Sequence, residues 1–191
     1  MSRRRLKKLL VLILVPALFG GRYAYDRYYA HHQQKSAERS HDNHAESGLY
    51  KVLEVHDGDT VTILVAGRAE RVRLIGIDAP EMGQRPWGKR AKEHLQDLFI
   101  SSGMKVRLEL DVEERDKYGR LLGYLWAKDG RLVNLVMLED GYAALFTFPP
   151  NVRHVSEFRA AHASARKAGR GIWGKGGLRQ KPSDYRKRNR R

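Results

Sequence analysis

The sequence predicts an α+β fold in which a five-stranded β-barrel is capped by three helices and preceded by an N-terminal hydrophobic signal or anchor helix. Three observations support this prediction. Five short segments, apolar or alternating in polarity and separated by turn residues, are typical of strands. Three later segments carry apolar residues at helical spacing. A basic stretch followed by an apolar run stands at the N-terminus.

The apolar run covers residues 9–21 and follows a cluster of arginine and lysine. This order is typical of an export signal, whose positive end stays in the cytoplasm. The run is shorter than the ~20 residues of a spanning helix, and no clean small-residue cleavage site follows it. We therefore assign residues 1–29 to a signal peptide or a signal-anchor. The domain is expected outside the cytoplasm, either secreted or periplasmic after cleavage, or tethered to the membrane through residues 9–21.

Residues 30–48 are polar and lack apolar periodicity, which indicates a linker. Its four histidines could bind a metal, but no acid or cysteine completes a ligand set, so a solvated tether is the simpler interpretation. The domain is assigned to residues 49–178, and the basic residues 179–191 are expected to be a disordered tail.

The formal net charge is +15, and most of the excess lies at the two ends of the chain. A basic balance favours polyanionic partners, either nucleic acid or an anionic membrane surface. The chain contains no cysteine. Disulfides, disulfide-linked partners, thiolate zinc sites and cysteine nucleophiles are therefore excluded.

The first three strands are expected over residues 50–55, 60–65 and 70–77. Asp57-Gly58 is a strong hairpin signal between the first two, and Gly67 turns the chain into the third. Pro80 cannot continue that strand, so the acids around it belong to the strand end or the following loop.

The remaining elements follow from two periodicities. Residues 104–111 alternate apolar with charged side chains, as a half-buried strand does, and residues 113–119 are expected to form a charged loop. Residues 121–127 form the fifth strand. Helices are expected over residues 87–99, 132–138 and 152–165. Three strands, a helix, two strands and then helices fit the five-stranded Greek-key OB-fold barrel, whose face commonly binds nucleic acid.

Acidic residues stand at the boundaries of two of these strands. Asp57 and Asp59 precede the second strand, whereas Asp78 and Glu81 follow the third. Hard divalent cations bind carboxylate and carbonyl oxygens. Two aspartates with water could therefore hold Ca²⁺ or Mg²⁺, and a third carboxylate left free of metal could activate water as a general base.

Two arginines could act beside these acids. Arg73 and Arg120 could clamp a phosphate and stabilise its added negative charge during attack by water. Arg73 and Asp78 are an odd number of positions apart, so they would face opposite sides of a regular strand. They converge only if the strand ends or bends between them, and Gly76 is the natural place for a bulge.

Each motif also has a simpler structural explanation. Asp-Gly-Asp alone is more typical of a hairpin turn, and Arg73 could be only an ion-pair partner of Asp78. Residues 116–120 could be a solvated loop. The combination is more specific than any single motif. It spans residues 50–174 and consists of Asp57-Gly58-Asp59-Thr60-Val61, Val72-Arg73-Leu74, Asp78-Ala79-Pro80-Glu81, Asp116-Lys117-Tyr118-Gly119-Arg120 and Gly171-Ile172-Trp173.

This combination strongly resembles the staphylococcal nuclease (thermonuclease) family. The resemblance implies an OB-fold barrel with three helices and a Ca²⁺-dependent phosphodiesterase that acts on DNA and RNA. It implies that Asp59 and Asp78 are the calcium carboxylates and that Glu81 is the general base. Arg73 and Arg120 correspond to the family's phosphate-binding arginines.

The resemblance also reaches the substrate pocket. Tyr118 corresponds to the family's nucleotide-site tyrosine. Ala79 stands where a threonine is found, and its backbone carbonyl is still available to calcium. Phe146 and Phe148 stand in place of two tyrosines. They could stack on a base without offering a phenolic hydrogen bond, or they could simply pack in the core.

Two alternatives to the nuclease remain. The same barrel could be a non-catalytic module that binds nucleic acid or serves as a scaffold, although the acids of the site are present here. In a third interpretation, the main function of the chain is to bind polyanions through residues 179–191. The expected partners are DNA, RNA or both, and a monomer is expected.

Overall fold

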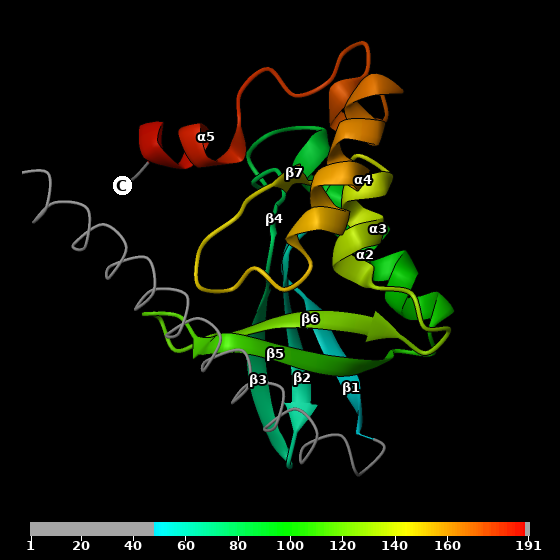
Figure 1. Ribbon diagram of the computed structural model, residues 1–191, viewed down its shortest axis with the longest axis vertical. Coiled ribbons are helices and arrows are strands. Elements are labelled where there is room, and N and C mark those ends of the chain that lie inside the picture. The colour runs from blue at the N-terminus through cyan, green and yellow to red at the C-terminus, as the bar shows by residue number, and fades with distance from the viewer. Residues whose placement is uncertain (1–47, 190–191) are drawn as a thin grey trace, which may run out of the picture. The chain divides into compact units, whose positions relative to one another are not determined.

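The structure is a computed structural model that describes residues 48–189 (Figure 1). Five strands form a closed barrel in the order β1-β2-β3-β6-β5. They are β1 (Leu49–Val55), β2 (Thr60–Val65), β3 (Arg68–Leu74), β5 (Lys105–Arg115) and β6 (Leu121–Ala127). Neighbouring strands are antiparallel except β3 and β6, which are parallel. The predicted α+β class and five-stranded barrel are confirmed, and the barrel fits the OB fold.

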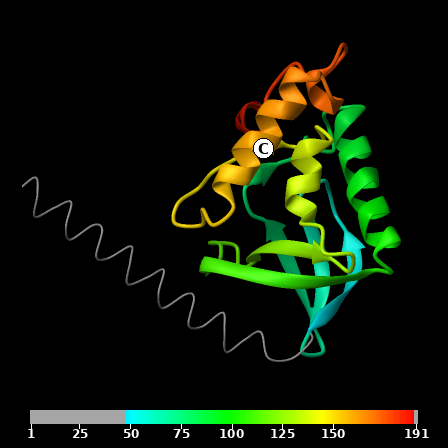
Figure 2. The same ribbon diagram turned by 45° about the vertical axis from the view of Figure 1, so that its right-hand side comes forward.

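The four α-helices of the described residues are α2 (Trp87–Ser101), α3 (Val133–Glu139), α4 (Val155–Lys167) and α5 (Pro182–Arg188), and a 3-10 turn, η1 (Gly171–Trp173), follows α4. Both ribbon views place α2, α3 and α4 at one end of the barrel (Figures 1 and 2). None of these helices is long and apolar enough to cross a membrane. The predicted signal or anchor helix and the linker fall outside the described residues.

The helix α5 corrects one prediction. Residues 179–191 were expected to be disordered, but residues 182–188 are helical. Pro182 occupies the first turn, where its missing N–H costs nothing. Asp184 lies in the first turn and basic residues fill the last turn, as the helix dipole favours. A seven-residue helix is marginal alone, so the contacts that α5 makes with the domain must support it.

Two strand boundaries also differ from the prediction. The third strand was expected over residues 70–77, with Gly76 as the place for a bulge. It divides there into β3 and a short β4 (Ile77–Asp78), which pairs with β7 (Ala144–Leu145) outside the barrel. Residues 113–119 were expected to form a charged loop, but β5 continues to Arg115. The Arg115 guanidinium holds this end of the strand through Glu70 of β3, at 2.9 Å.

The core fills the barrel and the space beneath the helices. The largest fully buried side chains are Val52, Val61, Ile63, Leu74, Ile77, Leu95, Phe99, Tyr124, Leu125, Met137, Leu138 and Phe158. Strands and helices both contribute to this set. Since burial of one such aliphatic side chain is worth about 1.5–3 kcal/mol, the core fixes the positions of the loops at the helical end of the barrel.

A polar network ties α4 to the barrel. The carboxylate of Glu109 in β5 accepts hydrogen bonds from Trp126 Nε1 at 2.6 Å and from Arg153 Nη1 at 2.9 Å, and it lies 3.2 Å from His154 Nε2. Burial opposes ionisation of this carboxyl group. The contacts with His154, Arg153 and Trp126 together outweigh burial and lower the pKa of Glu109 to about 2. The network therefore depends on an ionised Glu109.

We expect Glu109→Gln to lower the free energy of unfolding at pH 7 by about 2 kcal/mol, because charge-assisted hydrogen bonds are lost. The folded pKa lies below the usual value of 4.5. The stabilisation is therefore present above that value and is lost as the pH falls toward about 2. Urea denaturation over this pH range should show that the difference in free energy of unfolding between wild type and variant becomes smaller as the pH falls.

Glu114→Gln is the matched control, because Glu114 is exposed on the same strand. It should change the free energy of unfolding by no more than ~0.5 kcal/mol. The role of the network would be contradicted if both variants lost the same free energy of unfolding. It would also be contradicted if the loss for Glu109→Gln did not change with pH.

Candidate functional site

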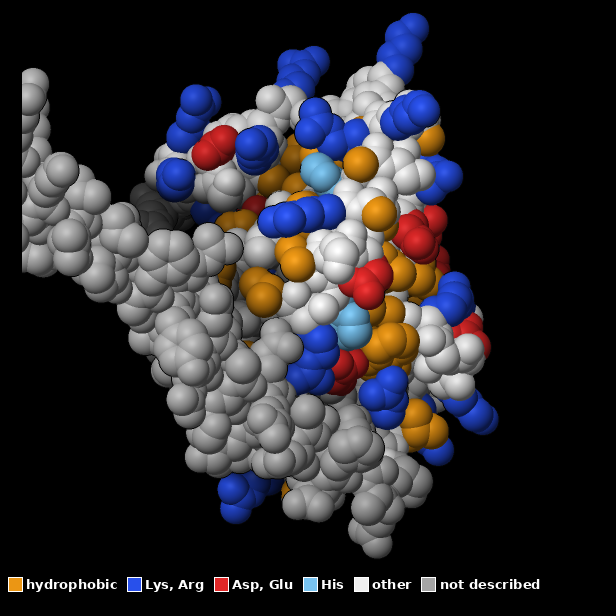
Figure 3. All heavy atoms as spheres, viewed as in Figure 1, with side chains coloured by type: hydrophobic (Ala, Val, Ile, Leu, Met, Phe, Trp, Pro, Cys, Tyr) orange, Lys and Arg blue, Asp and Glu red, His pale blue; other side chains and the backbone are white. Residues whose placement is uncertain are grey.

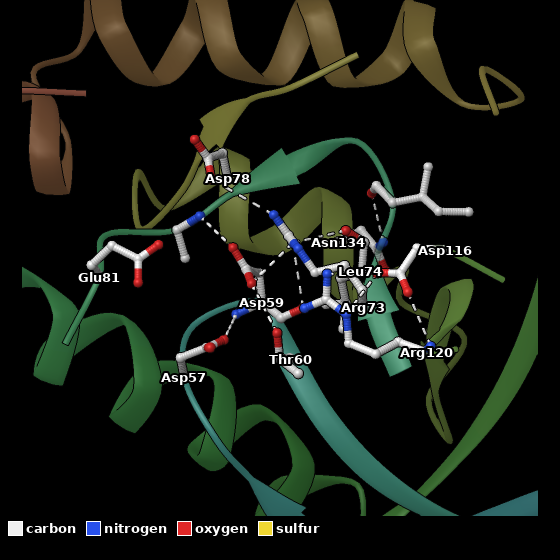
Figure 4. Close-up of polar contacts among 12 residues, drawn as sticks. Asp57, Asp59, Thr60, Arg73, Leu74, Asp78, Glu81, Asp116, Arg120 and Asn134 are labelled. Carbon is white, nitrogen blue, oxygen red and sulfur yellow. Dashed lines mark hydrogen bonds and ion pairs between the residues drawn. The ribbon is translucent and has the colours of Figure 1, made fainter. Parts of the chain in front are cut away.

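The predicted acids meet at the helical end of the barrel. Asp59 lies in the turn directly before β2, and Asp78 ends β4. Their exposed fractions are only 6% and 3%. Figure 4 shows both carboxylates directed toward the guanidinium of Arg73, which comes from β3. Acids from two separate loops are therefore gathered at one point.

Arg73 bridges the two buried aspartates. Its Nη1 lies 3.0 Å from Asp59 Oδ1, and its Nη2 lies 3.6 Å from Asp78 Oδ1. The same Nη1 also donates to the carbonyl of Leu74 at 3.1 Å. The ion pair between Arg73 and Asp78 is therefore present, and it belongs to a larger cluster that also includes Asp59.

Arg73 and Asp78 converge because the chain bends between β3 and β4. Gly76 has φ +82°, in the left-handed region. A Cβ at this glycine would lie 2.3 Å from the ring of Phe158 in α4. Only glycine satisfies both conditions. The bend predicted from the odd spacing of the two residues is confirmed.

A buried amide that the sequence analysis missed supports this bend. Asn134 in α3 is fully buried. Its Oδ1 accepts a hydrogen bond from Leu125 N at 3.0 Å, and its Nδ2 donates to the carbonyl of Ile75 at 2.9 Å. The available signal was one amide inside the apolar pattern of residues 132–138, since a buried amide in such a pattern needs backbone partners.

Asp59 is the most strongly perturbed acid of the site. Its Oδ2 accepts a hydrogen bond from the backbone N–H of Ala79 at 2.8 Å. Burial raises the pKa of Asp59 to about 7, against the opposing effect of Arg73, and the nearby Asp57 and Asp78 carboxylates add to the rise. A further positive charge beside Asp59 would therefore stabilise its ionised form.

Glu81 lies in the loop after β4 and is partly exposed. Its backbone N–H donates to Gln84 Oε1 at 3.0 Å. Its carboxylate accepts a hydrogen bond from Arg186 Nη1 at 2.6 Å, and the same nitrogen donates to Asp78 Oδ1 at 2.8 Å. Arg186 belongs to α5 and was not among the predicted site residues, because no local pattern marks a contact between segments so far apart.

Arg120 approaches the site from the loop between β5 and β6. Its Nε donates to Asp116 Oδ2 at 2.7 Å, which holds the side chain in place. In the parallel pair of β3 and β6, Arg73 lies opposite Leu122, so Arg120 stands two positions from the partner of Arg73. Figure 4 shows Arg120 on the same side of the barrel as Arg73.

Three aromatic side chains lie on the surface rather than in the core. Tyr118 is 72% exposed, and the charged groups of Lys117 and Arg120 lie 5.1 and 5.7 Å from its ring centre. Phe146 and Phe148 are 43% and 65% exposed, and their rings are stacked 6.5 Å apart. The alternative in which both phenylalanines pack in the core is wrong.

The donor set fits a hard cation. Asp59 and Asp78 provide carboxylate oxygens, and Ala79 follows Asp78 with a backbone carbonyl. Between residues 48 and 189, no group of three or more histidine, aspartate or glutamate side chains converges as a metal cluster. Two carboxylates with backbone and water oxygens suit Ca²⁺ or Mg²⁺ better than a transition metal. The buried Asp59, costly to ionise, is the group that such a cation would stabilise.

The sequence is similar to those of known nucleases. A family model described as staphylococcal nuclease homologue matches residues 71–175. A thermonuclease of Staphylococcus intermedius is 39% identical over 133 residues, which cover 65% of this chain and 75% of the relative. A thermonuclease of Staphylococcus hyicus is 34% identical over 136 residues, 69% and 79% of the two chains. Endonuclease YncB of Bacillus subtilis (strain 168) is 34% identical over 128 residues, 63% and 59% of the two chains.

We expect Gly76→Ala to lower the free energy of unfolding by about 3 kcal/mol, because the new Cβ would both strain the backbone and collide with Phe158. Gly130→Ala is the matched control: Gly130 has φ +84° with open space around its Cβ position. That variant should lose only about 1 kcal/mol. Equal losses in urea denaturation would show that the Phe158 contact does not hold the bend.

Proposed function

The chain belongs to the staphylococcal nuclease family, and from this we propose that it hydrolyses phosphodiester bonds of DNA or RNA with the help of a bound Ca²⁺ ion. The observation that carries the proposal is the cluster at the end of the barrel. Arg73 lies within ion-pair distance of Asp59 and Asp78, and Glu81 is joined to the same cluster. The attack of water on a phosphate requires groups of these kinds.

Asp59, Asp78 and the carbonyl of Ala79 would hold the cation. When bound, the ion supplies positive charge that stabilises the negative charge developing on the phosphate. The two carboxylates are fixed before binding, Asp59 by the backbone N–H of Ala79 and Asp78 by Arg73. The two oxygen ligands are therefore held near each other before the ion binds.

Glu81 is the proposed general base. It stands next to the cation ligands in the chain and is more exposed than either, so its carboxylate can reach a water molecule. It would accept the proton of the attacking water. Arg73 and Arg120 would donate hydrogen bonds to the phosphate oxygens and stabilise the added charge in the transition state.

The aromatic surface supports a polynucleotide as substrate. Tyr118, Phe146 and Phe148 are exposed, and the base of a nucleotide can stack on such rings with little sequence preference. The two phenylalanine rings cannot donate or accept a conventional hydrogen bond. This supports tolerant binding of single strands of DNA or RNA.

We also propose that the protein is exported, as the basic cluster and apolar run at its N-terminus suggest. Residues 1–29 would serve either as a cleaved signal or as a membrane anchor. A monomer is proposed as the working unit, since all the proposed site residues come from one domain.

We expect Glu81→Gln to reduce turnover about 10²- to 10⁴-fold while substrate binding changes little, because the amide cannot accept a proton from water. The measurement is cleavage of single-stranded DNA and of RNA by the full chain, with Ca²⁺ and with a chelator. Binding is followed in parallel by fluorescence anisotropy.

Glu93→Gln, on the outer face of α2, is the control and should keep wild-type turnover. A wild-type chain that binds DNA in a steeply salt-dependent way but never cleaves it with Ca²⁺ would support the non-catalytic alternative instead. Full activity of Glu81→Gln would remove Glu81 from the role of base.

A further inference from the structure

The C-terminal helix places a positive charge inside the candidate active site. Arg186 of α5 donates from one nitrogen, Nη1, to Asp78 Oδ1 and to Glu81 Oε1. These two carboxylates lie 108 and 105 positions earlier in the chain. One guanidinium group therefore joins a proposed cation ligand to the proposed general base.

Several further contacts hold the segment before α5 against the loop that carries Glu81. Gln84 Nε2 donates to the carbonyl of Gln180 at 2.9 Å, and Trp87 Nε1 donates to the carbonyl of Gly176 at 3.2 Å. The hydroxyl of Tyr185 lies so close to Gly83 that a Cβ there would be 2.3 Å away. We call residues 176–188 the C-terminal strap. Its docking is specific, because side chains of the loop and of the start of α2 reach backbone atoms of the strap.

The strap is nevertheless held weakly compared with the core. Pro182 is the one fully buried residue of α5. A cavity of about 430 Å³, lined by Gly83, Trp87, Tyr185 and neighbouring residues, lies between the strap and the loop. Figure 3 shows basic side chains on the outer surface of this end of the molecule. Because little apolar surface is buried, release of the strap costs far less than unfolding of the barrel.

Arg186 and a divalent cation would compete for Asp78. A calcium ion binds a carboxylate oxygen at about 2.3–2.6 Å, whereas Arg186 already lies 2.8 Å from Asp78 Oδ1. The two positive charges would repel each other strongly at such short range. The same guanidinium also donates to Glu81 Oε1, so it competes with water for one of the two oxygens of the proposed base.

We propose that the C-terminal strap is autoinhibitory: Arg186 competes with the catalytic divalent cation for Asp78 and occupies one oxygen of Glu81, so that cation binding releases the strap. The inference rests on the proposed function, because it assigns the same acids to the cation and to the water. Competition is reciprocal, so Ca²⁺ must weaken strap docking by the same factor as the strap weakens Ca²⁺ binding.

The first test is calorimetric titration of the full chain with Ca²⁺. We expect Arg186→Gln to bind Ca²⁺ about five- to tenfold more tightly. In the wild-type chain the docked strap lowers the fraction of molecules that can bind Ca²⁺, and the variant lacks this competition. Arg188→Gln is the matched control. Arg188 lies on the same helix and is exposed, and its side chain makes no ion pair or hydrogen bond within residues 48–189. It removes the same charge and should change the affinity less than twofold.

The second test follows the strap itself. Hydrogen exchange of the wild-type chain, read by mass spectrometry, should show residues 182–188 exchanging about tenfold faster with saturating Ca²⁺ than with a chelator. Tyr185→Ala keeps Arg186 but removes the ring that lies against Gly83. It should exchange fast in both conditions and should also bind Ca²⁺ more tightly, which separates docking of the strap from the charge of Arg186.

The outcomes distinguish the two proposals. If the wild-type chain cleaves DNA with Ca²⁺ but Arg186→Gln binds Ca²⁺ no more tightly than Arg188→Gln, the strap is structural and the autoinhibition is overturned while the nuclease stands. Weaker Ca²⁺ binding by Arg186→Gln would equally overturn it. If no variant binds Ca²⁺ or cleaves, both proposals fail together.

Discussion

The buried ion pairs of Arg73 with Asp59 and Asp78 are the constraint on which the rest of the site depends. Charges removed from water are tolerated only when their partners and hydrogen bonds are well placed. The protein meets this demand with the backbone N–H of Ala79 on Asp59 and with a bend at Gly76 that turns Asp78 toward the arginine. The cluster is therefore a product of barrel geometry rather than of one flexible loop.

Arg73 alone does not balance the negative charge at this end of the barrel. Burial still raises the pKa of Asp59, although Arg73 lies beside it. The acids therefore favour a second positive charge, and the chain itself offers one in Arg186. Either a guanidinium or a divalent cation can balance the negative charge of these acids. This explains why a distant helix can dock where an ion is expected.

The periphery of the site follows a different logic. Tyr118, Phe146 and Phe148 are large rings left in water, which is costly unless a partner covers them. Phe146 is nevertheless well fixed, because its backbone N–H donates to the carbonyl of Gly76 at 3.0 Å. The bend that orients Asp78 therefore also fixes the backbone of Phe146, one of these exposed rings.

The sequence by itself determined what local pattern encodes: the spans of β2 and β6, the spacing that required a bend at Gly76, and the acids and arginines of the site. The pairing of β4 with β7, the extension of β5 to Arg115 and the support of Asn134 were decided by tertiary structure alone. The docking of Arg186 on Glu81 was decided in the same way. Periodicity reports which residues are buried within one segment. It carries no information on which distant segment contacts a given residue, because those contacts depend on how the barrel closes and on where the C-terminal segment packs.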